Sequence, residues 1–210
     1  MTERGMIFNA EMVRAILDGR KMQTRRPVKF PVHDKNLGCE LAGNELAGEL
    51  SAGNYLNSAF NKPGDRIWVR ETFCPVDDTQ YGGEKWVDYR ATPRYEASHP
   101  AGWDSAPNDA EALKWRPSIH MPRWASRILL EITGVRVERL NSISQEDAQA
   151  EGLELTGWRP TYSDPDSGGE VMTPYDNFAQ LWESIYGEES WKANPWVWVI
   201  EFKRVEGGAA

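Results

Sequence analysis

The apolar side chains near the start of the chain recur at helical spacing. Between residues 12 and 17 they share one face, which predicts a helix over residues 10–18. Asn9 is a suitable N-cap for this helix and Gly19 a suitable C-cap. Residues 24–26 are then expected to be extended, because Pro27 disfavours helical geometry in the residue before it.

Two later segments also have helical patterns. Ser144 is followed by an acidic side chain three residues later, which is typical of a helix N-terminus and predicts a short helix that stops near Gly152. Residues 175–186 place Phe178, Leu181, Trp182 and Ile185 on one face, as an amphipathic helix does.

Alternation of polar and apolar side chains predicts strands elsewhere in the chain. The pattern occurs at residues 66–71, directly after the turn at residues 62–65, and again at residues 135–140. Strands are also predicted at residues 86–91, 128–133 and 196–202. Separated strands with few helices predict an α+β fold built on a small mixed sheet or closed barrel, rather than a parallel α/β sheet.

The remaining stretches lack a regular period and are rich in Gly, Pro, Ser and Asp. We expect a single domain over residues 1–205, followed by a flexible tail over residues 206–210. The domain is expected to carry loop-rich insertions at about residues 31–61 and 75–115 and a loop at about residues 156–174. A short helix within the first insertion is left open.

The composition is that of an ordinary globular chain with an unusual number of tryptophans. Of 210 residues, 40% are hydrophobic and 10 are Trp, which add apolar area to a core or to a binding surface. The net charge of -8 argues against generalised binding to a phosphate backbone. A local basic site for a small or single-stranded ligand remains open.

Several classes of protein are disfavoured by what the sequence lacks. Cys39 and Cys74 have neither the spacing of metal ligands nor that of a disulfide framework, and we expect no metal or other cofactor. The sequence has no apolar run of membrane-spanning length and no signal-peptide pattern. We therefore expect a cytoplasmic protein that does not bind a membrane; its oligomeric state is left open.

A basic run at residues 19–26 reverses the acidic character of the chain. It places Arg20, Lys21, Arg25 and Arg26 within seven residues, together with the hydroxyl of Thr24. Such a reversal favours a place that holds an anionic or polar group. The alternative is that Arg20 and Lys21 sit on a solvated face and compensate the dipole at the end of the first helix.

A second cluster mixes cationic and aromatic side chains just before a predicted strand. Its arginines and Trp124 suit stacking on unpaired bases and contact with phosphates. The alternatives are that Trp124 belongs to the core, that the arginines pair with acids, and that His120 is structural. The cluster comprises Arg116, His120, Arg123, Trp124 and Arg127.

Four spaced motifs in the chain resemble the ASCH family, whose fold is a small β-barrel related to the PUA domain. The chain as a whole is also similar to phage and prophage proteins of that family, which would place it in a bacterial host cytoplasm. The four motifs are residues 19–26, 63–70, 143–152 and 198–202, and the phage-type members share the patterns at residues 115–127 and 194–198.

The resemblance implies binding of RNA or a nucleotide-like ligand in a cleft beside the barrel. Small bacterial members hydrolyse the amide of N4-acetylcytidine, and their catalytic Lys, Thr and Glu fall on Lys21, Thr24 and Glu151. Other relatives cleave RNA, and many have no known activity. The candidate ligand-binding residues are Arg20, Arg26, Trp68, Arg70, Glu71, Arg123 and Trp124.

Amide hydrolysis needs a nucleophile, a proton carrier and an oxyanion contact. Thr24 is the candidate nucleophile, Lys21 the base if burial and nearby cations lower its pKa, and Arg26 the oxyanion or phosphate contact. Glu151 would orient Lys21 or move a proton to the leaving amine. The alternatives are an ordinary strand threonine, a solvated lysine and a Glu151–Arg26 salt bridge without chemistry. A phage accessory protein that binds a host protein is the competing function.

Overall fold

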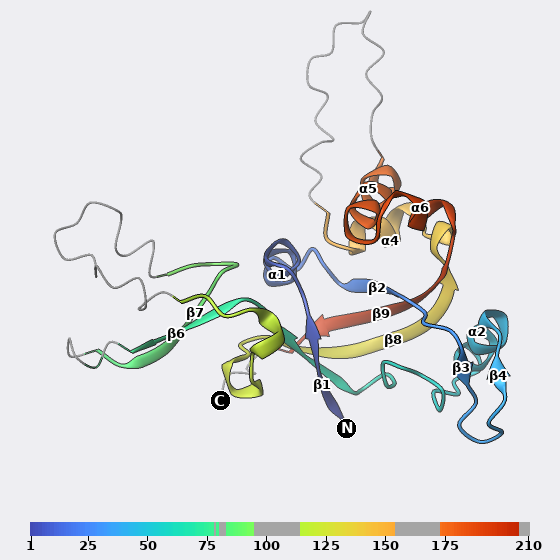
Figure 1. Ribbon diagram of the computed structural model, residues 1–210, viewed down its shortest axis with the longest axis horizontal. Coiled ribbons are helices and arrows are strands. Elements are labelled where there is room, and N and C mark those ends of the chain that lie inside the picture. Colours follow the sequence, from blue (N-terminus) through green and yellow to red (C-terminus); the bar gives the residue numbers. More distant parts are fainter. Residues whose placement is uncertain (78, 80–82, 95–113, 154–172, 206–210) are drawn as a thin grey trace, which may run out of the picture. The chain divides into compact units, whose positions relative to one another are not determined.

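The computed structural model describes residues 1–77, 79, 83–94, 114–153 and 173–205 (Figure 1). The chain divides into two compact units, which are described separately. Unit 1 comprises residues 1–17, 66–130 and 204–210, and unit 2 comprises residues 18–65 and 131–203.

Unit 1 is built around two parallel strands and a hairpin. In it β1 (Glu3–Ile7) pairs with β5 (Arg66–Arg70), and Met6 is opposite Val69. The hairpin consists of β6 (Phe73–Asp77) and β7 (Lys85–Tyr89), which pair antiparallel. The remaining elements are helix α1 (Ala10–Leu17), the short 3-10 helices η2 (Ser118–His120) and η3 (Arg123–Ala125), and the first residues of β8 (Leu129–Arg139).

Local chemistry accounts for these elements. The Asn9 side chain accepts a hydrogen bond of 2.8 Å from the backbone N–H of Met12, so it caps α1 as predicted. Gly19, two residues after the helix, has a φ of +74°, which an L side chain adopts only with strain. Strand β5 alternates buried and half-buried residues, as its sequence predicted.

Unit 2 contains the longer strands. Strand β9 (Trp196–Arg204) lies between β8 and β2 (Gln23–Pro27), and it pairs antiparallel with β2 so that Arg25 is opposite Val199 (Figure 1). The other elements are β3 (Val32–His33), β4 (Glu40–Leu41), α2 (Gly43–Ser51), η4 (Leu140–Ser142), α4 (Gln145–Ala150), α5 (Pro174–Tyr186) and α6 (Glu188–Lys192).

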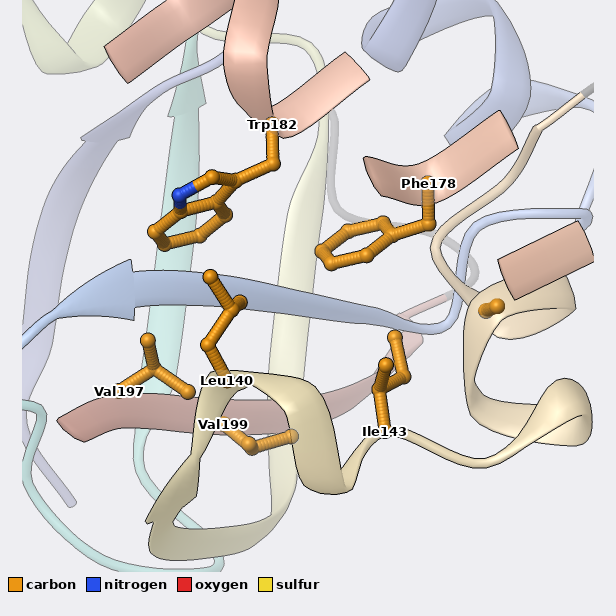
Figure 2. Close-up of a cluster of buried hydrophobic side chains, with 7 residues drawn as sticks. Leu140, Ile143, Phe178, Trp182, Val197 and Val199 are labelled. Carbon is orange, nitrogen blue, oxygen red and sulfur yellow. The ribbon is translucent and has the colours of Figure 1, made fainter. Parts of the chain in front are cut away.

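Helix α5 packs its apolar face against β9 and the segment after β8. The rings of Phe178 and Trp182 face Leu140, Val197 and Val199, as Figure 2 shows. The helix begins with a capping box in which Thr173 and Asp176 bond each other's backbone N–H groups, with Pro174 at the first helical position. This cluster fixes α5 relative to β9 within unit 2.

The structure confirms a mixed α+β fold, as the sequence predicted. The helices predicted at residues 10–18, 144–150 and 175–186 and the strands predicted at 66–71, 86–91 and 196–202 are all present, with ends shifted by up to two residues. The two strands predicted around Gly134 are one continuous strand, β8.

Other parts of the fold were not predicted. Strands β1 and β6, helix α6 and the β3–β4 pair had no clear pattern in the sequence. The strands that the structure describes form no closed barrel. The stretch at residues 31–61, for which the sequence leaves a short helix open, contains α2, and its Leu46 is fully buried, so this stretch has an apolar contact face. The loop predicted at 156–174 and the tail lie almost entirely outside the described residues.

Candidate functional site

The backbone brings the basic run beside the end of α4 within unit 2. Lys21 forms an isolated antiparallel bridge with Glu151, and the N–H of Met22 donates a hydrogen bond of 2.8 Å to the carbonyl of Ala150. Glu151 is the C-cap of α4, and the next residue, Gly152, has a φ of +86°. The left-handed glycine ends the helix there, so the Glu151 carboxylate stays next to Lys21.

Lys21 and Glu151 form a buried ion pair. Lys21 Nζ donates one hydrogen bond of 2.8 Å to Glu151 Oε2 and another of 2.8 Å to the Glu151 carbonyl oxygen. The Lys21 side chain has no exposed surface. Burial lowers the pKa of Lys21 below its ordinary value of 10.5, Glu151 opposes this shift, and the charges of Arg26 and Arg25 add to it. The solvated-lysine alternative is therefore wrong.

Arg25 holds the other side of the same carboxylate. Its Nη1 donates a hydrogen bond of 3.0 Å to Glu151 Oε1, while its Nη2 lies 2.8 Å from Glu138 and 3.0 Å from Asp147. The guanidinium is fully buried and lies 5.7 Å from the ring centre of Phe178. Glu151 therefore pairs with Lys21 on one oxygen and with Arg25 on the other.

Arg136 extends this cluster toward the surface of unit 2. It binds the second oxygen of Glu138 at 3.0 Å, shares Asp147 Oδ2 with Arg25 at 2.7 Å, and contacts Glu201. The cations Lys21, Arg25 and Arg136 therefore face four carboxylates, those of Glu138, Asp147, Glu151 and Glu201. Much of the charge of the basic run is thus balanced inside the protein.

Sequence reasoning named Arg25 only as one of the cations near Lys21 that could lower its pKa, and it did not place Arg136, Glu138 or Asp147 in the site. The available signal was the alternation in β8, which puts Arg136 and Glu138 on one face of the strand. Asp147 had been assigned only to the start of α4, where its N–H does bond to Ser144 Oγ. Its carboxylate binds Arg25 and Arg136 rather than contributing to the helix cap.

Thr24 lies three residues after Lys21 but is not part of this cluster. It is buried in β2 and is opposite Ile200, whereas Arg25 is opposite Val199. Successive side chains of a strand point to opposite faces, so Thr24 and Arg25 lie on different faces of β2. Among the described residues, Thr24 makes no hydrogen bond to Lys21 or Glu151.

The two remaining cations of the basic run have different settings. Arg20 is partly exposed and forms a hydrogen-bonded ion pair of 2.9 Å with Asp18. Arg20 Nη1 donates a hydrogen bond of 2.8 Å to the carbonyl of Gly152. This bond links the basic run to the residue after Glu151. Arg26 is half-buried in β2, opposite Trp198. Its charge lowers the pKa of Lys21.

The other predicted ligand-binding residues lie in unit 1. Trp68 and Arg70 share a face of β5, with the guanidinium 5.4 Å from the indole centre. Arg70 Nε donates a hydrogen bond of 3.1 Å to the Ser118 carbonyl, and Arg70 also donates to the carbonyl of Ile119. Arg70 therefore fastens the η2 segment to β5.

Glu71 is buried against Arg127. The guanidinium binds both carboxylate oxygens, at 2.9 and 3.0 Å, and its carbon lies 4.0 Å from the ring centre of Tyr89. Burial raises the pKa of Glu71 above its ordinary value of 4.5, and the hydrogen bonds and charge of Arg127 oppose that shift. The geometry is that of a bidentate ion pair that joins the residue after β5 to the segment before β8 within unit 1.

Trp124 and Arg123 lie on the surface of unit 1. Trp124 is 72% exposed, so the alternative that it belongs to the core is wrong. Arg123 Nε pairs with Glu3 at 3.0 Å, and His120 is exposed. The alternative that arginines of this cluster pair with acids holds for Arg123 and Arg127.

A hollow of about 540 Å³ lies elsewhere in unit 2 and shares no lining residue with the Lys21 cluster. It is formed by the β3–β4 turn and the loop after α2. The lining includes Lys35 and Lys62 as cations and Asp65 as the acid. Lys35 Nζ is already bonded to the carbonyl of Leu56 at 2.6 Å.

No group of three or more His, Cys, Asp and Glu side chains in the described part of the chain is placed to hold a metal ion. No helix within the described ranges is long and apolar enough to cross a membrane.

Comparison with known proteins gives little further information. No protein-family model matches the chain, and no curated protein matches it. Among solved structures, the chain is similar to one described as protein EF3133 from Enterococcus faecalis V583, with the family description DUF984. The identity is 11%, the match covers 98% of this chain and 81% of that one, and the TM-score is 0.38. A similarity at this level carries no argument about fold or function.

Proposed function

We propose that the protein is an amidohydrolase that removes the acetyl group from N4-acetylcytidine or a related acylated cytidine. Lys21 is the proposed base, Thr24 the nucleophile and Glu151 the residue that orients Lys21. The observation that supports this proposal best is the buried Lys21 ammonium, held at 2.8 Å by Glu151 and shifted to a lower pKa. Perturbed ionisable groups of this kind are concentrated at functional sites.

A lowered pKa is the property that a catalytic lysine needs. At an ordinary pKa the amine is protonated at neutral pH and accepts no proton, whereas desolvation favours the neutral form. Burial is the largest influence on Lys21, and two arginines of its own segment act in the same direction. Glu151 acts against them, so this pairing adjusts how much neutral amine is present.

The proposed reaction has two stages. The neutral amine of Lys21 takes the proton of the Thr24 hydroxyl while Oγ1 attacks the acetyl carbonyl carbon. The C–N bond breaks, the proton passes to the exocyclic nitrogen, cytidine leaves and an acetyl ester remains on Thr24. Water then attacks the ester with Lys21 as base, the proton returns to Thr24 Oγ1, and acetate and a proton are released.

The proposal also requires movement at the site. The Lys21 side chain has no exposed surface, and Thr24 lies on the other face of β2 from Arg25. The substrate must therefore gain access to the buried Lys21 amine and bring the Thr24 hydroxyl within reach of it. Catalytic hydrogen bonds commonly tighten only in the substrate complex.

Cytidine release from N4-acetylcytidine by the purified protein tests this function. Release by the wild type should be lost in Lys21→Met and Thr24→Val. Lys29→Met is the matched control, because Lys29 is an exposed lysine shortly after β2. No release by the wild type, or equal release by Lys21→Met, would refute the amidohydrolase proposal.

A second candidate function is binding of single-stranded RNA, and the exposure of Trp124 favours it. An indole that is 72% exposed next to Arg123 suits stacking on an unpaired base. Trp124→Ala should weaken binding of a single-stranded RNA, measured by fluorescence anisotropy, and leave the melting temperature unchanged. Unchanged affinity would remove Trp124 from the RNA-binding surface.

We also propose that the chain is an ASCH-family member with a PUA-related barrel, of the phage or prophage type. This rests on the four motifs in their order along the sequence. Two of them, residues 19–26 and 143–152, supply the residues of the Lys21–Glu151 pair. A crystal structure of the whole chain tests the barrel, which requires closure of the strands around a single core.

A further inference from the structure

We propose that Arg25 is a positioning residue, which holds one carboxylate oxygen of Glu151 so that the other oxygen faces the ammonium group of Lys21. Its role in catalysis rests on the proposed amidohydrolase function. The ionic arrangement itself does not rest on that function, because it is defined by contacts within unit 2.

The carboxylate of Glu151 is held from two sides. Arg25 Nη1 lies 3.0 Å from Oε1, and Lys21 Nζ lies 2.8 Å from Oε2. Glu151 caps a helix of only six residues and is followed by a glycine. The helix therefore does little to fix the rotamer of this side chain, and the Arg25 contact supplies that restraint.

Arg25 is itself fixed in place by other groups. Its Nη2 bonds to Glu138 of β8 and Asp147 of α4, and its guanidinium carbon lies over Phe178 of α5. The planar guanidinium reaches carboxylates in different directions at once, which a lysine ammonium on a flexible stem does less well. Shape as well as charge is therefore needed at position 25.

Arg25 also affects the protonation of Lys21. Its positive charge favours the neutral amine, and it neutralises part of the negative charge that would hold the proton on Lys21. Loss of Arg25 should therefore raise the pKa of Lys21. The charged groups around the pair are Arg26 on β2, Glu151 and Asp147 at α4, Glu138 and Arg136 on β8, and Glu201 on β9.

Arg136 provides a matched control. It shares Glu138 and Asp147 with Arg25 and contacts Glu201, but its ion pairs do not include Glu151. Arg136→Met therefore disturbs the same cluster without releasing the Glu151 carboxylate. A general loosening of the cluster should appear in both variants, whereas the positioning effect should appear only at Arg25.

The experiment follows the NMR titration of the Lys21 side chain in the wild type, Arg25→Met, Arg25→Lys and Arg136→Met. The Lys21 signal is assigned by its absence in Lys21→Arg. We expect the Lys21 midpoint to rise in Arg25→Met and to stay near the wild-type value in Arg136→Met. For N4-acetylcytidine hydrolysis, kcat should fall by about 100-fold in Arg25→Met with little change in KM.

Arg25→Lys separates geometry from charge and is the deciding variant if Arg25→Met does not fold. This variant retains a positive charge but loses the planar guanidinium group that reaches several carboxylates at once. We therefore expect its kcat to remain well below the wild-type value. Full activity and an unchanged Lys21 midpoint in Arg25→Lys would overturn the proposal. So would an unchanged midpoint in folded Arg25→Met.

The titration does not depend on catalysis. A wild-type protein without hydrolase activity, in which Arg25→Met still raises the Lys21 midpoint, would refute the proposed function and leave the positioning of Glu151 by Arg25 intact. Hydrolase activity in the wild type without a shift of the Lys21 midpoint in Arg25→Met would refute the positioning of Glu151 by Arg25 and leave the proposed function intact.

Discussion

The ammonium nitrogen of Lys21 lies 2.8 Å from Oε2 of Glu151, although 130 positions separate the two residues in the sequence. Both side chains are almost completely buried. Two buried charges are tolerated only when they pair and the remaining polar atoms are bonded, as the Glu151 carbonyl and Arg25 achieve here. This pair therefore affects both the stability of unit 2 and its proposed chemistry.

Removing one charge of the pair should destabilise the protein strongly. Glu151→Gln leaves the ammonium of Lys21 buried without a counter-ion, which costs about 3–5 kcal/mol. The double variant Lys21→Met with Glu151→Gln should lose less than the sum of the two single changes. Urea unfolding measures the free energy of unfolding of the two single variants and of the double variant. If Glu151→Gln lowered the free energy of unfolding no more than the loss of an exposed ion pair does, this would contradict the burial of Lys21.

The lowered pKa of Lys21 predicts a specific pH dependence of stability. Between the folded-state pKa and the ordinary value of 10.5, the unfolded chain binds the Lys21 proton and the folded protein does not. The contribution of Lys21 to the free energy of unfolding should therefore rise with pH in that window.

The measurement for Lys21 is urea unfolding of the wild type and of Lys21→Met at several pH values up to 10.5. The difference between the two free energies isolates Lys21 from other titrating groups. It should shift in favour of the wild type as the pH rises. A difference that is flat across the window would show that the lysine has an ordinary pKa.

The two arginine pairs of unit 1 should differ sharply in their effect on stability. Arg127→Met leaves the buried Glu71 carboxylate unpaired, at a cost of about 3–5 kcal/mol. Arg123→Ala breaks an exposed pair with Glu3, which is worth about 1 kcal/mol or less. Chemical denaturation of both variants checks the difference, and equal losses would contradict the assigned burial.

Two glycines of α2 should respond to alanine in opposite ways. A Cβ at Gly43 would overlap the indole of Trp196, so Gly43→Ala should destabilise the protein by about 1–3 kcal/mol. A Cβ at Gly48 meets no atom within 4 Å, and alanine there should stabilise the helix by up to about 1 kcal/mol. Thermal unfolding of the two variants tests the packing of α2 on Trp196.

The apolar contact of α5 with β9 gives a further test (Figure 2). Trp182 is buried in the cluster with Val197 and Val199, and Trp182→Ala should cost about 3–5 kcal/mol. Ile185 on the same helix is 46% exposed, and Ile185→Ala should cost clearly less. Similar losses at both positions would mean that α5 presents a different face to β9.

Much of the secondary structure could be predicted from local pattern. The first helix has an Asn cap and a helical apolar period, and β5 and β9 alternate or are continuously apolar, so local chemistry was sufficient. Strand β1 was missed because its five residues have only one buried position, Met6. Its pairing with β5 is a long-range effect that no local period encodes.

The site was predicted only in part. The resemblance placed Lys21 and Glu151 together, and the structure brings them into contact. Arg25 was expected only as a nearby cation that could lower the pKa of Lys21, and its ion pairs were not predicted, because they depend on carboxylates from β8 and α4 that are distant in sequence. The side on which Thr24 lies depends on the register of β2 with β9, which residue spacing alone does not give.

The rate of cytidine release from N4-acetylcytidine as a function of pH tests the central claim most directly. The account predicts release by the wild type that increases with pH through the Lys21 midpoint and is lost in Lys21→Met, while Lys29→Met retains it. No release by the wild type, or a pH profile that Lys21→Met leaves unchanged, would contradict it.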